Sequence, residues 1–323
     1  MNLLLSVGLI FAGIALIVYF AEKLVEAAVG TARGFGLSAF VVSVVFIGFD
    51  PENLGVGAVG TYEGVAGIAL GSIIGAALVA IALAFGITAL FAPMEFAQAP
   101  GTVLVLPIVA VVLFGALCLD GELSRADGGI LLAGYAAAVG YLLHLSRRGV
   151  QIEPAEGREM REAERLGRWK AFFLLVLSLV AITGGGEMVV RGSKTVIERL
   201  GISETFFGMT ILAFMVSIEE LARELPAALE GRAEIAFGNV AGSIFAFFLL
   251  NAGLIALVRP IPVERQVLAF HLPAAVATTI LVSGIVMTRR VPRWAGVLLV
   301  VLYVGFIVGS YFIGRGPGRF PAS

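Results

Sequence analysis

Two short stretches place acidic residues inside otherwise apolar sequence. The first is FIGFDPENLGVG (46–57), and the second is LAFMVSIEELAREL (212–225). A charged side chain at the centre of a membrane-spanning helix costs roughly 2.5–3.5 kcal/mol on insertion scales, so it usually faces a cavity or a partner. Carboxylates are ligands that hard cations such as Ca²⁺ prefer. The two stretches therefore predict cation chemistry at membrane depth.

Each stretch also has features of an interrupted helix. Pro51 removes a backbone donor and disfavours a helical conformation at Asp50, which frees carbonyl groups for ions. The same reasoning applies more weakly around 217–220, where no proline precedes Pro226. The sequence thus predicts a helix break with acids beside it in each half of the chain. The charged residues expected at this depth are Asp50, Glu52, Glu219, Glu220, Arg223 and Glu224.

The elements that hold these residues are predicted from composition. The 323 residues are 59% hydrophobic and 14% charged, whereas soluble domains carry about 25% charge. A single cysteine excludes a disulfide framework, and a net charge of −1 gives no basic footprint for nucleic acid. With no nucleophile–base pair and no HExxH-type motif, we expect neither an enzyme nor a bound cofactor. The remaining class is a polytopic membrane protein in contact with the lipid bilayer.

Apolar runs long enough to cross a bilayer fill most of the chain. Six runs are uninterrupted by charge and four carry isolated charges, which predicts an all-α fold of about ten membrane-spanning helices. The uninterrupted runs are 66–92, 101–118, 127–146, 233–257, 266–288 and 294–313. The charged ones are 2–32, 38–60, 170–200 and 205–230.

The runs form two similar halves. The polar stretch 147–169 separates a first five-helix unit (1–146) from a second (170–323). GVAGIALG (64–71) matches GRAEIAFG (231–238) at an offset of 167 residues. Because five is odd, the second copy must be inverted relative to the first, as in many secondary transporters.

Basic residues predict the orientation. Arg289, Arg290 and Arg293 fall on the same side as 147–169, and the positive-inside rule makes that side cytoplasmic. We therefore expect a multi-pass protein of the cell (plasma) membrane, with both termini extracellular.

The stretch from 200 to 245 resembles the second alpha-repeat of the calcium/cation antiporter superfamily, which comprises the sodium/calcium and proton/calcium exchangers. Its SIEEL (217–221) stands where the family has the end of a GTS-x-PEL motif. EIAFGNVAGS (234–243) stands where the family has DIA-x-GN-x-x-GS. The helices preceding each repeat are also similar, so the resemblance covers nearly the whole chain.

The resemblance implies a central cation site built by both repeats. Glu220 inherits the second-repeat glutamate, beside Glu219, while Ser217 and Ser243 supply hydroxyl oxygens and Asn239 takes the asparagine position. The first repeat departs from the family. The repeat offset puts Asn53 at the glutamate position and Asp50 at the serine position, whereas a one-residue slip would give the glutamate position to Glu52. The candidate ligands are Asp50, Glu52, Asn53, Ser217, Glu219, Glu220, Asn239 and Ser243.

Three functional readings follow. The first is an antiporter that exchanges Ca²⁺ for Na⁺, and the second couples Ca²⁺ or another cation to H⁺. The third is a non-transporting or channel-like regulatory protein, which the amides and hydroxyls missing from the first repeat favour. Arg223 adds a further choice, because its fixed charge either takes the place of a cation or pairs structurally with Glu219, one helical turn away.

Overall fold

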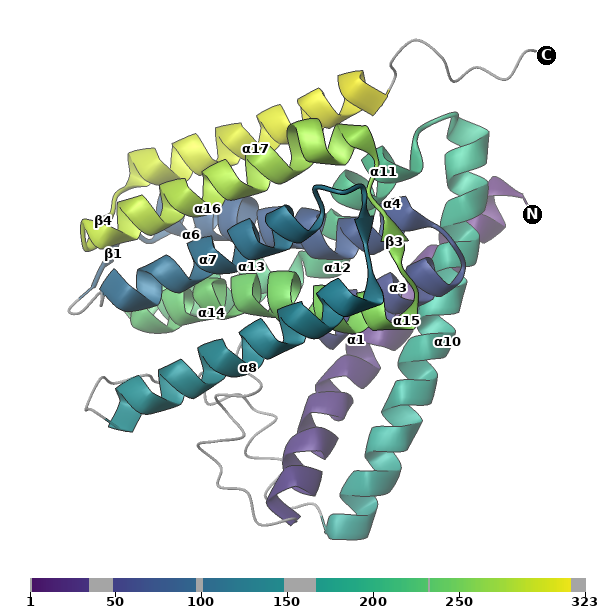
Figure 1. Ribbon diagram of the computed structural model, residues 1–323, viewed down its shortest axis with the longest axis horizontal. Coiled ribbons are helices and arrows are strands. Elements are labelled where there is room, and N and C mark those ends of the chain that lie inside the picture. Colours follow the sequence, from purple (N-terminus) through teal and green to yellow (C-terminus); the bar gives the residue numbers. More distant parts are fainter. Residues whose placement is uncertain (1, 35–48, 97–100, 148–166, 232, 315–323) are drawn as a thin grey trace.

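The computed structural model describes residues 2–34, 49–96, 101–147, 167–231 and 233–314. Helices dominate this part of the chain (Figure 1). Those of the first half are α1 (Leu3–Gly34), α3 (Pro51–Tyr62), α4 (Ala66–Leu70), α5 (Ala76–Leu78), α6 (Phe85–Phe91), α7 (Gly101–Leu117) and α8 (Arg125–Arg147). Those of the second are α10 (Arg168–Leu200), α11 (Glu204–Phe206), α12 (Ala213–Ser217), α13 (Glu219–Leu229), α14 (Ala233–Phe245), α15 (Ala252–Val258), α16 (Leu272–Met287) and α17 (Arg293–Gly314).

Segments of π-helix and short strands complete the architecture. The π-helical segments are η1 (Gly71–Gly75), η2 (Val79–Ala84), η3 (Phe207–Leu212), η4 (Ala246–Asn251) and η5 (Val267–His271). The strands are β1 (Met94–Glu95), β2 (Glu122–Leu123), β3 (Ile261–Pro262) and β4 (Arg290–Val291). β1 pairs antiparallel with β4, and β2 pairs antiparallel with β3, so each small sheet joins the two halves of the chain.

Seven of the described helical segments have the length and hydropathy needed to cross a membrane, and the bent pair 204–217 and 219–229 makes an eighth. The apolar part of α7, Leu104–Leu117, is shorter than a full span. The predicted span 38–60 lies partly in 35–48, outside the described residues, as does most of the linker 147–169. The all-helical class agrees with the sequence-based expectation.

The structure repeats at the offset found in the sequence. β3 begins 167 residues after β1, at 261 against 94. α15 begins 167 residues after α6, at 252 against 85, and η4 begins 167 residues after η2, at 246 against 79. The glycines are reciprocal too: a Cβ on Gly86 would lie 3.2 Å from the Gly296 carbonyl oxygen, and one on Gly253 would lie 3.0 Å from that of Gly128. Reciprocal contacts are what a twofold relation between the halves requires.

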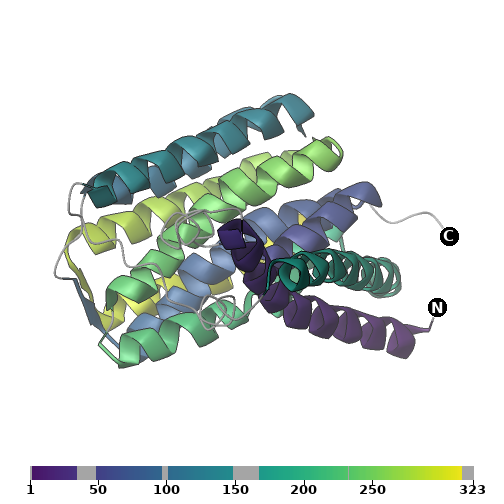
Figure 2. The ribbon, with the colours of Figure 1, turned by 90° about the horizontal axis from the view of Figure 1, so that it is seen from below.

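Two spans form the centre and the others surround them. In the spans 66–91 and 238–258, 83% of the most apolar window is buried, against 22% in α1. α1 and α10 lie side by side and cross the remaining helices at a steep angle (Figures 1 and 2). Their outward faces carry large exposed apolar side chains, among them Phe11, Tyr19, Phe172 and Phe173. Such a face is suited to lipid.

An ion pair fastens the turn between α3 and α4 to α10. Lys194 Nζ lies 2.8 Å from Glu63 Oε2, and the Lys194 hydrogen bond, with its charge, lowers the pKa of Glu63 from 4.5. A carboxylate with a lowered pKa stabilises the fold above its unfolded-state pKa, and this contribution is lost as the pH falls through the folded-state value.

We therefore expect Glu63→Gln to lower the Tm slightly at neutral pH, because partly exposed pairs contribute little. The difference from the wild type should vanish as the pH drops below 4.5. Thermal unfolding of the purified protein at a series of pH values from neutral to about pH 3 measures this. A difference that stays constant into the acid range would contradict the assignment.

Candidate cation-binding site

The first acidic stretch begins a helix at the position that Pro51 predicts. Asp50 is extended, with φ −122° and ψ 90°, and α3 starts at the following proline. Asp50 Oδ1 accepts a hydrogen bond of 2.7 Å from the backbone N–H of Asn53 and so caps the helix. The local sequence thus fixes Asp50 at a helix start, where its second carboxylate oxygen faces other side chains.

The second stretch is interrupted at the matching point. α12 ends at Ser217, α13 begins at Glu219, and the two helical axes differ by 49°. Ile218, between them, stands 167 residues after Pro51. Both expected breaks are present, including the second one, for which the sequence offered the weaker signal.

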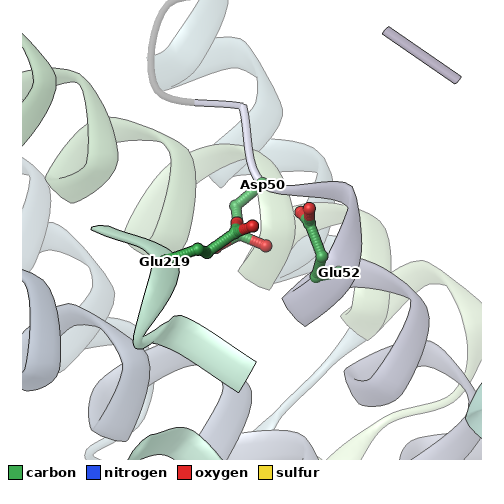
Figure 3. Close-up of side chains that lie close together, drawn as sticks. All are labelled: Asp50, Glu52 and Glu219. Atoms are coloured by element: carbon green, nitrogen blue, oxygen red, sulfur yellow. The ribbon is translucent and has the colours of Figure 1, made fainter. Parts of the chain in front are cut away.

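Three carboxylates from the two breaks come together (Figure 3). One ligand atom each from Asp50, Glu52 and Glu219 lies within 4.8 Å of the other two. Asp50 and Glu52 are each only 1% exposed. Buried carboxylates this close repel one another unless positive charge lies among them. The arrangement is therefore suited to a cation.

An amide connects the two halves beside these acids. Asn53 Nδ2 donates to Asp50 Oδ2 at 2.8 Å and to Ser217 Oγ at 2.9 Å. Its Oδ1 atom is buried without a hydrogen-bond partner, as is Oε2 of Glu52. Unpaired buried oxygens are costly, so these two are candidate ligands for an ion.

Glu220 occupies a second set of polar contacts. Its Oε2 accepts a hydrogen bond of 2.7 Å from Asn239 Nδ2, and its Oε1 accepts one of 3.3 Å from Ser243 Oγ. Arg223 joins this set to the first: its Nη2 lies 3.0 Å from Glu219 Oε1, and its Nη1 lies 4.0 Å from Glu220 Oε1. All eight candidate ligands expected from the sequence thus belong to one connected cluster.

The positions of Glu52 and Asn53 bear on the register of the first repeat. Under the offset of 167 residues, Glu52 corresponds to Glu219 and Asn53 to Glu220. Glu52 and Glu219 share the three-carboxylate group, as equivalent residues on either side of a twofold axis would. The geometry favours the register without a slip, with an asparagine at the first-repeat glutamate position.

Two further polar residues reach the cluster. Asn251 Nδ2 donates to the Asp50 carbonyl oxygen at 3.1 Å, and it was detectable only as a lone amide within the apolar run 233–257. Glu224 was expected at membrane depth but not as a ligand. It is fully buried, lies 3.4 Å through Oε1 from Asn239 Nδ2, and has no partner for Oε2. Both add oxygens to the site.

Comparison with known proteins gives one family. The family model described as "Sodium/calcium exchanger protein" matches residues 5–144 and 170–312, which is most of both halves. The chain is 28% identical over 349 aligned positions to the sodium/calcium exchanger MaX1 of Methanosarcina acetivorans, covering 96% of this chain and 98% of that one. It is 29% identical over 317 positions to the inner membrane protein YrbG of Escherichia coli, covering 95% and 96%.

Solved structures give the same fold. The sodium-calcium exchanger NCX_Mj, soaked with 10 mM Na⁺ and 10 mM Sr²⁺, superimposes with a TM-score of 0.61 at 25% identity. The match covers 95% of this chain and 99% of that one. The similarity therefore extends over the whole arrangement of helices and is not confined to the acidic motifs.

Proposed function

Because this chain belongs to the sodium/calcium exchanger family and is a multi-pass membrane cation exchanger, not an enzyme, we propose that it exchanges Ca²⁺ for Na⁺ at the carboxylate cluster. The observation that carries the proposal is the meeting of Asp50, Glu52 and Glu219, contributed by both halves, within 4.8 Å of one another. A site shared between two repeats can open to either side in turn as the repeats move against each other.

The dimensions of the cluster suit Ca²⁺. Calcium–oxygen distances are about 2.3–2.6 Å, so ligands on opposite sides of one ion lie about 5 Å apart. The three carboxylate atoms fall within that span, and small rotations would bring them to a single ion. The unpartnered oxygens of Glu52 and Asn53 would help to complete the six to eight ligands that Ca²⁺ takes.

Exchange follows if the two cations occupy the same oxygens at different times. One Ca²⁺ or several Na⁺ can neutralise these carboxylates, but both cannot do so together. The amide and hydroxyl oxygens of Asn53, Ser217 and Ser243 favour Na⁺ as the counter-ion, because they add neutral ligands. The abundance of acids supports the alternative, Ca²⁺ exchanged for H⁺, because a carboxylate binds a proton without further ligands.

Flux through the purified protein in lipid vesicles tests the proposal. Vesicles are loaded with Na⁺, diluted into Na⁺-free buffer that contains Ca²⁺, and followed with an internal calcium dye. We expect Ca²⁺ uptake that stops when K⁺ replaces Na⁺ inside and that an acidic interior without Na⁺ does not drive. Uptake driven by the acidic interior alone would assign H⁺ as the counter-ion. Gradient-independent leak, or no flux, would contradict exchange and favour a channel-like or regulatory role.

We also propose the orientation given by the basic residues, in the cell membrane with 147–169 cytoplasmic and both termini outside. Single cysteines introduced at Ser323 and in the linker, in a Cys118→Ala background, test it with an impermeant thiol reagent on intact cells. Labelling of the terminus but not the linker is expected, and the reverse pattern would overturn the orientation.

A further inference from the structure

Arg223 is a fixed positive charge inside the carboxylate cluster. Its Nη2 atom lies 3.0 Å from Glu219 Oε1 and 4.0 Å from Glu52 Oε1, and its Nη1 atom lies 4.0 Å from Glu220 Oε1. The three acids come from α3 and α13, and so from both halves of the chain. Within the described part of the chain, Arg223 is the one basic side chain that forms ion pairs with these acids.

A structural pairing along one helix does not account for these contacts. Arg191 and Glu187 on α10 provide the comparison, because they form an ion pair with the same i, i+4 spacing. Among the described residues, the ion pairing of Arg191 is confined to that glutamate, whereas Arg223 also reaches Glu52 of the other half. The guanidinium therefore holds a position between the repeats.

That position is one a transported cation would otherwise take. A guanidinium stays charged at any physiological pH, and its side chain keeps it from leaving with the transported ions. It cannot complete the site as a small ion would, because Glu52 Oε2 and Asn53 Oδ1 remain buried without hydrogen-bond partners. The cluster thus combines one permanent positive charge with oxygens that still lack a ligand.

Building on the proposed exchange, we propose that Arg223 is a built-in cation of the transport site that replaces one monovalent ion. Asp50, Glu52, Glu219 and Glu220 carry four formal negative charges, and Arg223 offsets one of them permanently. The site then binds one Na⁺ fewer than its carboxylates alone would require. The exchanger would accordingly move fewer Na⁺ per Ca²⁺ than the same site without the arginine.

Counting bound Na⁺ tests this role without relying on transport. When an ion binds the folded state, stability rises with the logarithm of its concentration in proportion to the number of ions bound. We expect Arg223→Gln to increase the number of bound Na⁺ by one, measured from unfolding temperatures across a Na⁺ titration. The titration is run at about pH 8.5, so that Na⁺ rather than a proton compensates a carboxylate.

Two further variants separate charge from structure. Arg223→Lys keeps the positive charge and should bind the wild-type number of Na⁺. The double variant Arg223→Gln/Glu219→Gln removes one positive and one negative charge, so it too should return to the wild-type number. Arg191→Gln, which breaks the matched pair on α10, should change nothing.

The outcomes are distinct. An unchanged Na⁺ count in Arg223→Gln overturns the inference and leaves Arg223 as a structural partner of Glu219. If that variant does not fold, a double variant that binds one Na⁺ more than the wild type also overturns it. A wild type whose stability does not respond to Na⁺ contradicts the proposed Na⁺ coupling itself, whereas normal Na⁺-driven Ca²⁺ flux with an unchanged count removes only the role of Arg223.

Discussion

Glu220→Gln is expected to abolish cation exchange while the protein still folds. The carboxylate is 1% exposed and belongs to the polar cluster shared by the two halves. Its removal deletes a charged ligand, and affinity for Ca²⁺ depends strongly on the number of charged ligands. We expect Ca²⁺ affinity to fall by roughly 100-fold, equivalent to about 2.7 kcal/mol, and Na⁺-driven uptake to fall to the level of empty vesicles.

The fold should survive because glutamine keeps the local hydrogen bonds. Its side-chain oxygen can accept from Asn239, and its amide can donate to the Ser243 hydroxyl, so neither buried group is left unpaired. Glu187→Gln, the same exchange on the exposed face of α10, is the control and should transport normally. Wild-type flux in Glu220→Gln would place the transported ion elsewhere.

The second half of this site is readable from sequence for a physical reason. Glu219 and Glu220 interrupt an apolar run, and a charge at that depth requires a partner or an ion. Asp50 is readable for the same reason, and Pro51 adds the position of the helix start. The repeat offset then places the two acidic stretches at equivalent points, which predicts that they meet.

The contacts across the site are not readable in this way. Which acid Arg223 approaches depends on the distance between α3 and α13, and no local pattern encodes that distance. Asn251 is similar, because it bonds to the Asp50 carbonyl group from a segment 201 residues away. The bend at Ile218 also lacks the proline that marks the first break. Sequence therefore identifies the ligands better than their connections.

The fold depends on the place where the two central helices cross, and glycine makes that crossing possible. Gly67 and Gly71 lie against η3 of the other half, and a Cβ on either would overlap backbone atoms there. A Cβ on Gly208 would in turn overlap the Gly67 carbonyl group. Small residues allow this close approach between membrane helices. Because the obstacle is backbone, no side-chain rotation can relieve it.

Gly208→Ala should therefore destabilise the protein, by at least about 2 kcal/mol, although alanine is the better helix former by about 1 kcal/mol. Gly284→Ala is the matched control, since a Cβ at that position in α16 would meet no atom within 4 Å. Here the helix propensity acts alone, so the control should be neutral or more stable than the wild type. Thermal unfolding followed by size-exclusion chromatography compares the two. If both variants shift in the same direction, the crossing does not depend on Gly208, and the two halves are held together mainly by the contacts around them.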